Sequence, residues 1–145
     1  MKTAIIYESW HHGNTKKLCD AIKEKFNADL FDVKEGVGEL GGYDLIGIAS
    51  GIAYSKFYKE ITQFVKESFP REKDVFLLYT CGKPSKDFAK EIKNILSDKK
   101  CTVKGTYCCK GLDNYGPFKL IGGLNKEHPT EAEIQGAVDF VEKIL

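Results

Sequence analysis

The segment Glu8–Thr15 contains the residues whose chemistry is easiest to infer from the sequence. It has hydroxyls at Ser9 and Thr15, a flexible Gly13, and backbone N–H groups between an apolar run and a segment with helical periodicity. N–H groups at the start of a helix, with hydroxyls beside them, hold a phosphate dianion without arginine. The same residue types also suit an ordinary turn and helix cap. Taken alone, this segment indicates an anion site and a plain turn about equally.

Two later segments have features that suit a flat ring. Ser50–Tyr58 contains Gly51 and Tyr54, and Thr80–Lys83 places a glycine between polar side chains. A ring-shaped cofactor needs flat apolar walls and polar backbone at its edge. We therefore expect Tyr54 to stack on a ring. Phe57, at the start of the next helical pattern, is expected to belong to the core.

The composition restricts the class of protein and its partners. With 145 residues, of which 42% are hydrophobic, the chain is expected to form a single domain, residues 1–145, with its own core. Lysine and arginine total 22 against 21 acidic residues, and Arg71 is the only arginine, so no nucleic-acid partner is expected. The N-terminal apolar stretch is too short for a signal peptide, and no run suits a membrane span. We expect a cytoplasmic protein without stable membrane insertion.

The cysteines and histidines indicate neither a metal site nor a disulfide framework. The five cysteines, which lack the C-x-x-C spacing of a redox dithiol, are Cys19, Cys81, Cys101, Cys108 and Cys109. Beside the adjacent His11 and His12 there is only His128, and no thiol or carboxylate cluster adjoins the pair. We expect free thiols in a reducing compartment, a packing role for Cys19 and no metal. Cys81 is expected to be a small residue in a loop or at a strand end rather than a redox thiol.

Apolar runs of β type alternate about five times with segments of helical periodicity, which is typical of a βαβ sheet. Strands are predicted at Thr3–Tyr7, Asp29–Val33, Asp44–Ala49, Val75–Thr80 and Cys101–Cys109. Helices are predicted around residues 18–26, 57–69, 88–96 and 134–145, the last with a capping-box start at Thr130. The glycine-rich segment Gly36–Gly42 is expected to form mostly loop, with at most one helical turn.

The hydrophobicity of these strands predicts the topology. The first, third and fourth are nearly continuous apolar runs, as in central parallel strands, whereas the second and fifth suit edge positions. This pattern predicts an α/β fold, a three-layer, doubly wound five-stranded parallel sheet in the order 2-1-3-4-5. Ligands bind such sheets at the carboxyl ends of the strands, beside the first strand. The segments expected there are Glu8–Thr15, Ser50–Phe57, Thr80–Lys83 and Lys110–Pro117.

The first of these segments resembles a known signature. Ile5–Ser9 followed by Gly13–Thr15 is similar to the FMN-phosphate motif of flavodoxins, in which an apolar strand leads to Ser/Thr-x-Thr-Gly-Asn-Thr. The spacing is one residue longer than usual, and His11 and His12 stand where one threonine is typical. The resemblance implies a flavodoxin-like fold, FMN as cofactor, and a low-potential one-electron carrier. It also implies a monomer that docks transiently with redox protein partners.

The resemblance further implies which residues contact the cofactor. Gly51 would let a carbonyl accept a hydrogen bond from the reduced flavin, and Thr80 and Gly82 would contact its pyrimidine end. Tyr115 would reach the ring or cover its edge. The full set of implied FMN contacts is Ser9, Trp10, His11, His12, Gly13, Asn14, Thr15, Ser50, Gly51, Ile52, Ala53, Tyr54, Thr80, Cys81, Gly82, Asp113 and Tyr115. No catalytic side chain is expected, because the flavin carries the chemistry.

The same fold carries several unrelated functions, so only the site residues can distinguish between them. Gly51–Lys59 also resembles the corresponding loop of flavodoxin-like protoporphyrinogen oxidases, so an FMN oxidoreductase of that type, or of a quinone-reducing type, is the alternative. A phosphate-accepting receiver domain would need an aspartate where Ser50 stands. Gly13–Lys17 lacks the G-K-[ST] of a P-loop. No cysteine is followed by arginine at the spacing of a low-molecular-weight tyrosine phosphatase.

Overall fold

A computed structural model describes residues 1–8, 13–82, 87–110 and 129–145 of the chain. The strands in these ranges are β1 (Thr3–Glu8), β2 (Asp29–Asp32), β3 (Leu45–Ala53), β4 (Lys56–Phe57), β5 (Asp74–Cys81) and β6 (Thr102–Lys110). The helices are α1 (Asn14–Phe26), α2 (Lys59–Ser68), α3 (Lys90–Asp98) and α4 (Glu131–Ile144).

The sheet has the predicted topology with one addition. Its strands follow the order β2-β1-β3-β5-β6, and each neighbouring pair is parallel. These are the five predicted strands in the predicted order 2-1-3-4-5. The short β4 lies off this path and pairs antiparallel with the end of β3, so the sheet has six strands rather than five.

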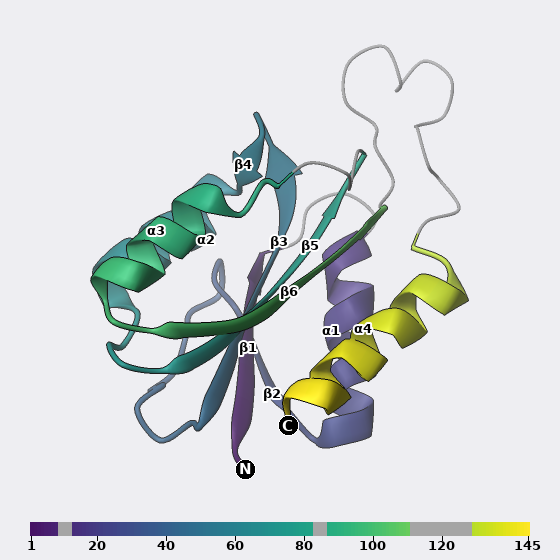
Figure 1. The fold of residues 1–145 in the computed structure, drawn as a ribbon, viewed down its shortest axis with the longest axis horizontal. Coiled ribbons are helices and arrows are strands. Elements are labelled where there is room, and N and C mark those ends of the chain that lie inside the picture. Colours follow the sequence, from purple (N-terminus) through teal and green to yellow (C-terminus); the bar gives the residue numbers. More distant parts are fainter. Residues whose placement is uncertain (9–12, 83–86, 111–128) are drawn as a thin grey trace.

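The three predicted layers are present. Helices α1 and α4 cover one face of the sheet, and α2 and α3 cover the other (Figure 1). Successive strand residues point to opposite faces, so Ile5 packs with α1 and α4 while Ile6 packs with α2 and α3. Each helix contributes an apolar stripe at a spacing of four residues, such as Ile61 and Val65 in α2.

The strands differ in burial as the sequence predicts. Every residue of β1 is buried, and so is β5 after its first residue. By contrast, β2 and β6 are only partly covered, which confirms their assignment as edge strands. Between β2 and β3 there are turns and bends without a helix, as expected. The capping box at the start of α4 is also confirmed, because Thr130 and Glu133 exchange side-chain and backbone hydrogen bonds.

The segment after the third predicted strand is the main correction to the secondary structure. Instead of ending at Ala49, β3 continues to Ala53 and turns back into β4 through Tyr54 and Ser55. Both turn residues have positive φ, 53° and 65° respectively. A two-residue hairpin with this geometry is usually made by Asn-Gly or Gly-Gly. Tyr-Ser carries no such signal, so the sequence did not predict the hairpin.

No helix in the described ranges is long and apolar enough to cross a membrane.

Candidate functional site

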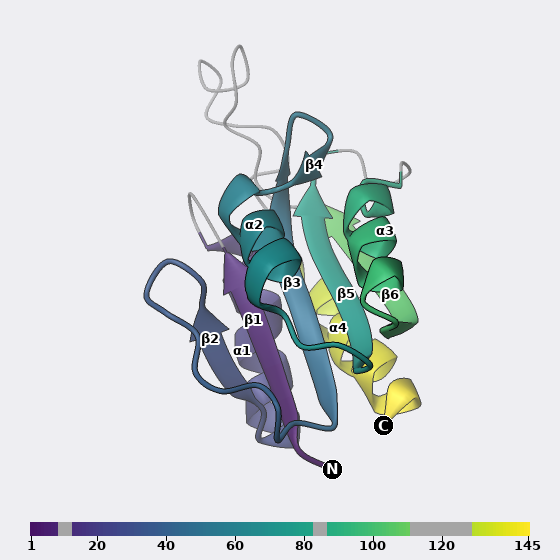
Figure 2. The ribbon, with the colours of Figure 1, turned by 90° about the vertical axis from the view of Figure 1, so that its left-hand side faces the viewer.

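The carboxyl ends of the central strands lie together at one edge of the sheet (Figure 2). Among the described residues, six polar or charged side chains are buried, and all but Thr3 lie at or next to this edge. These five are Glu8, Asn14, Thr15, Ser50 and Thr80. Burying polar groups is costly unless they are hydrogen-bonded, so their gathering at one edge marks the candidate site.

The start of α1 is arranged to accept an anion. Gly13, the residue before the helix, has φ 65° and ψ 35°, a left-handed conformation that favours glycine. It makes no side-chain capping hydrogen bond, and the first turn has no acidic residue. The first N–H groups of any α-helix lack acceptors within the helix and carry a partial positive charge. This helix start therefore offers donors to a negatively charged group.

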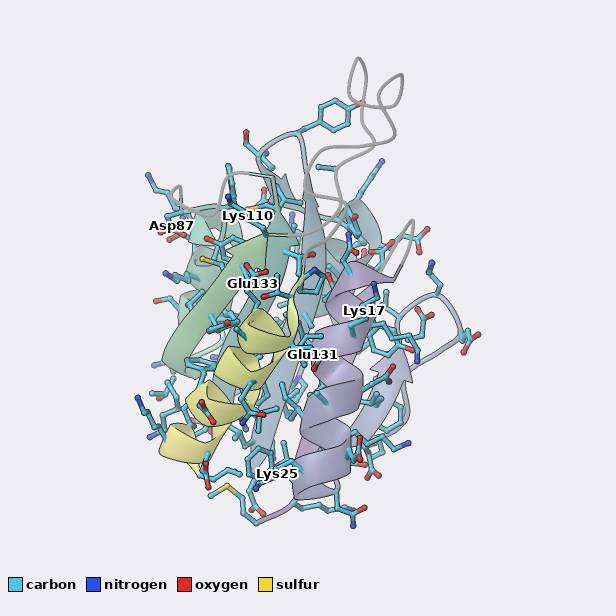
Figure 3. The ribbon with its side chains drawn as sticks, turned by 90° about the vertical axis from the view of Figure 1, so that its right-hand side faces the viewer. Lys17, Lys25, Asp87, Lys110, Glu131 and Glu133 are labelled. Atoms are coloured by element: carbon cyan, nitrogen blue, oxygen red, sulfur yellow. The ribbon has the colours of Figure 1, made fainter. Side chains whose placement is uncertain are left out.

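The other helices have acidic or capping side chains at their starts. In α3 the Asp87 carboxylate accepts a hydrogen bond from the Ala89 N–H at 2.9 Å, just before the helix begins. In α4 Thr130 and Glu133 form the capping box, and Glu133 also accepts from the Lys110 N–H at 3.3 Å (Figure 3). The first turns of α2, α3 and α4 all contain glutamate. Within the described part of the chain, α1 alone has neither feature.

A buried hydroxyl pair connects α1 with β5. The Oγ1 atoms of Thr15 and Thr80 lie 2.9 Å apart, within hydrogen-bonding distance. Thr15 is 1% exposed and Thr80 4% exposed, so solvent does not compete for this bond. A hydroxyl donates one hydrogen bond and accepts two. Thr15 is therefore able to accept from Thr80 and donate to a ligand at the start of α1.

Glu8 lies in the predicted segment Glu8–Thr15, but the sequence did not predict its role. Its side chain is 1% exposed, and Oε1 accepts a hydrogen bond from the Ile61 N–H, in the first turn of α2, at 3.0 Å. The two residues are 53 positions apart in sequence. The only local signal was an acidic residue at the end of an apolar strand. The acceptor role depends on how α2 packs.

Ser50 supports the same helix start from the neighbouring strand. Its Oγ accepts a hydrogen bond from the Tyr58 N–H at 3.0 Å and donates to the Gly51 carbonyl at 2.6 Å. A Cβ atom on Gly51 would lie 2.3 Å from the Tyr58 hydroxyl oxygen. The Tyr58 side chain thus approaches Gly51 so closely that a larger residue there would force it to move. It lies in an extended strand, and the carbonyl contact with a flavin stays a prediction.

The hairpin between β3 and β4 forms the outer part of this edge. Tyr54, at its turn, is 85% exposed, whereas Phe57 is 4% exposed and packs in the core, as expected. The stacking of Tyr54 on a ring stays a prediction. A groove of about 960 Å³ runs from the hairpin between α2 and α3. Its lining includes Tyr54, Phe88 and Glu91.

The cysteines near the site lie in the packed part of the fold. Cys81 is the last residue of β5 and is buried, which confirms its assignment to the strand end. Burial raises the pKa of the Cys109 thiol to about 12, and it raises the pKa of the Cys19 thiol as well. None of the five cysteines, which all lie in the described ranges, forms a disulfide bond. No cluster able to hold a metal ion occurs in the four described ranges.

The two lysines in the first turn of α1, Lys16 and Lys17, add no buried positive charge to the site. Lys16 Nζ pairs with the Asp20 carboxylate at 3.0 Å, and the hydrogen bond to Asp20 raises the pKa of Lys16. Lys17 projects from the first turn of α1 into solvent (Figure 3). Both lysines are exposed, so the buried donors at this helix start are backbone N–H groups, the Asn14 amide and the Thr15 hydroxyl.

The structure brings most of the described site residues together. Those at or beside the edge are Gly13, Asn14, Thr15, Ser50, Gly51, Thr80, Cys81 and Gly82. Ile52 and Ala53 continue β3 and lead outward to Tyr54. The remaining predicted residues lie outside the described ranges; they are Ser9, Trp10, His11, His12, Asp113 and Tyr115.

Comparisons with known proteins agree with this architecture. A protein of Methanocaldococcus jannaschii described as uncharacterised is 40% identical over 148 residues, covering 100% of this chain and 99% of that protein. The fold is similar to that of a flavodoxin from the domain Archaea, with a TM-score of 0.63 and 20% identity over 98% of both chains. It is also similar to Fusobacterium nucleatum flavodoxin bound to flavin mononucleotide, with a TM-score of 0.66 and 17% identity over 99% of this chain and 97% of that one.

The two structural similarities concern the fold alone, because the identities are low. The family assignment rests on the sequence, since the flavodoxin domain family matches residues 4–115, more than half of the chain. This confirms the resemblance first indicated by Gly13–Thr15. The chain belongs to the flavodoxin family.

Proposed function

We propose that this chain binds FMN at the carboxyl edge of its sheet and works as a low-potential one-electron carrier between redox proteins. The observation that carries the proposal is the start of α1, where, among the described residues, Gly13 supplies no capping side chain and the first turn holds no acidic residue. A phosphate monoester is the external anion that fits such a site. Flavodoxins of known structure that share the fold include one bound to flavin mononucleotide.

The residues at the start of α1 fit the phosphate of FMN. Gly13 keeps the helix entrance free of a side chain, and the buried Thr15 hydroxyl has a donor to offer while it accepts from Thr80. FMN supplies reversible electron transfer when it is bound. The protein holds the cofactor, orients it and restricts water around it.

The ends of β3 and β5 are assigned to the ring. Gly51 and Thr80 are paired in register, so the backbone of both strands ends beside the start of α1. Tyr54 extends beyond this edge and is largely exposed. In the proposal it covers one face of the ring and takes part in transient docking of redox proteins. A monomer in the reducing cytoplasm fits five cysteines that are all free thiols.

The groove beside the hairpin favours a second candidate function. Its volume of about 960 Å³ is within the usual size of small-molecule sites, and it shares Ala53 and Tyr54 with the proposed ring segment. Phe57 and Phe88 add apolar surface to it. A substrate in this groove would make the protein an FMN oxidoreductase of the protoporphyrinogen oxidase or quinone-reducing type.

Binding and redox titration test the proposal. The purified protein is expected to bind FMN more tightly than riboflavin, because riboflavin lacks the phosphate, and to take up electrons in two one-electron steps under a chemical reductant. Equal affinity for FMN and riboflavin would contradict the phosphate site. Rapid turnover of a quinone or porphyrinogen would favour the oxidoreductase over the carrier.

A further inference from the structure

Tyr54 is the one large hydrophobic side chain in the described part of the chain that is exposed away from the two chain ends. Its exposure is 85%, and the other large hydrophobic residues that are exposed are Met1 and Leu145. The hairpin that carries Tyr54 holds two non-glycine residues at positive φ, a conformation that costs free energy and is concentrated at functional sites. An exposed tyrosine on such a turn is typical of a residue that contacts a protein partner.

The groove between α2 and α3 continues the surface of this hairpin. The two helices lie side by side on one face of the sheet, with the hairpin at their N-terminal ends (Figure 2). The apolar part of the groove includes Phe57, Phe88 and Ile95, and the last two are partly exposed. An apolar side chain of a partner therefore has a surface to pack against next to Tyr54.

Two acidic side chains of this α2–α3 groove are paired with lysines. Glu91, in the first turn of α3, forms an ion pair with Lys56 of β4 at 3.5 Å. Asp87, just before the same helix, forms an ion pair with Lys93 at 3.7 Å. The first pair also links the hairpin to α3, since Lys56 lies in the strand that returns from Tyr54. Neither carboxylate therefore gives the groove a net negative charge.

The other lysines of the groove leave a positive excess. Lys59, Lys66 and Lys90 line it, are exposed, and take part in none of the ion pairs found in the described ranges. Asp98 is the one acidic lining residue that is also outside these pairs. Lys59 and Lys90 are the first residues of α2 and α3, so both lie at the hairpin end of the groove. Positive charge is thus concentrated near Tyr54.

We propose that the α2–α3 groove and Tyr54 form the docking surface for a redox protein with an acidic surface. The proposal rests on FMN binding at the carboxyl edge, because Tyr54 belongs to the segment assigned to the ring. Carboxylates of the partner contact Lys59 and Lys90, and an apolar side chain of the partner packs between the two helices. One electron then passes between the two redox centres, and no bond forms or breaks. Exposed charges of this kind steer the encounter and raise its rate more than its affinity.

Two forms of one electron acceptor, cytochrome c, test the polarity of this surface. Native cytochrome c is basic, and succinylation of its lysines makes it acidic while the haem stays the same. The reduced holoprotein, freed of excess dithionite, is expected to reduce the succinylated form roughly tenfold faster than the native form at low ionic strength. Stopped-flow measurements give both rate constants. The rate constant for the succinylated form should fall as salt is added, because salt screens the attraction.

Variants locate the effect on the groove. The double variant of Lys59→Gln and Lys90→Gln should slow reduction of the succinylated form roughly tenfold, because two opposite charges about 7 Å apart in water change an equilibrium constant roughly threefold. Lys25→Gln removes an exposed lysine from the last turn of α1, at the other end of the molecule, and should leave the rate constant unchanged (Figure 3). The midpoint potential should be the same in the wild type and both variants, which separates docking from driving force.

Two results would overturn this docking surface while leaving FMN binding intact. The first is faster reduction of native than of succinylated cytochrome c at low ionic strength. The second is the same rate constant in the double variant and in Lys25→Gln. A wild-type protein that binds no FMN would overturn the proposed function itself, and with it this docking role.

Discussion

The starts of α1 and α2 lie at the same edge of the sheet but differ in whether protein side chains accept hydrogen bonds from their N–H groups. At α1 the entrance is a left-handed glycine with no acidic residue in the first turn. At α2 the N–H groups of Tyr58 and Ile61 are taken by Ser50 and Glu8, which come from two neighbouring strands. Both helix starts present the same backbone donors. The difference lies in whether the protein supplies the acceptor.

This difference separates a ligand site from a structural cap. A helix start that is filled by the protein's own carboxylate has little positive potential left for an external anion. In the proposed function, the start of α1, with Thr15 buried beside it, keeps that potential for the phosphate of FMN. Variants that make one helix start resemble the other, or that weaken either arrangement, test the distinction.

Asn14→Asp makes α1 resemble α2 and should have the largest effect. Asn14 is buried in the first turn of α1, so an aspartate there places a carboxylate next to the bound phosphate. At close range in a partly buried site, repulsion between the two anions should reduce FMN affinity about 100-fold or more. Riboflavin affinity, measured by the same fluorescence titration, should change little because riboflavin has no phosphate.

A matched substitution controls for the change in net charge. Asn94→Asp introduces the same carboxylate at an exposed position of α3 and should leave FMN affinity as in the wild type. Aspartate in the first turn of a helix interacts favourably with the helix dipole, so Asn14→Asp should not unfold the protein. Equal losses for FMN and riboflavin would argue against a phosphate at α1.

Thr15→Val should weaken FMN binding roughly 30-fold, because it removes a hydrogen bond to a charged group. It also leaves the buried Thr80 hydroxyl without the partner 2.9 Å away, so the free energy of unfolding should fall. Isothermal titration and urea unfolding measure the two effects separately. Thr80→Val removes the same hydroxyl pair but leaves the Thr15 donor. A similar loss of FMN affinity in both variants would mean that the pair, and not the Thr15 donor, supports binding.

The fold could be predicted because its determinants are local or periodic. The apolar runs of β1, β3 and β5 indicate central strands, since parallel strands covered on both faces need them. The role of Gly13 at the entrance of α1 could also be predicted, because a glycine between a strand and a helix is a local signal. The order of the sheet and the site at its carboxyl edge then followed from rules of α/β topology.

The start of α2 could not be predicted because its determinants are distant in sequence. Glu8 and Ile61 are brought together only by the packing of a helix across the sheet. The hairpin at Tyr54 and Ser55 lacks glycine and asparagine, so a positive φ at both positions had no local indicator. Burial of a carboxylate is likewise a tertiary property. Sequence patterns therefore indicated the anion site at the start of α1 and missed the capping of α2 by Glu8 and Ser50.

Gly51→Ala should disturb the packing between β3 and the start of α2. The new Cβ atom would lie 2.3 Å from the Tyr58 hydroxyl oxygen and 2.6 Å from the ring carbon that bears it, so the side chain must move. Overpacking of this kind costs about 2 kcal/mol of unfolding free energy. Gly42→Ala is the control, because nothing lies within 4 Å of its Cβ position. Equal stability of the two variants in urea would show that Tyr58 adjusts freely.

Ser50→Ala should have the smallest effect of the series and bears directly on how α2 is capped. The variant removes the acceptor for the Tyr58 N–H while leaving the Glu8 contact with Ile61 in place. Loss of one capping hydrogen bond costs about 1 kcal/mol, measured by urea unfolding. Ser68→Ala, at the exposed far end of the same helix, should be neutral. If Ser50→Ala were also neutral, Glu8 alone would cap α2, and the contrast between the two helix starts would rest on a single carboxylate.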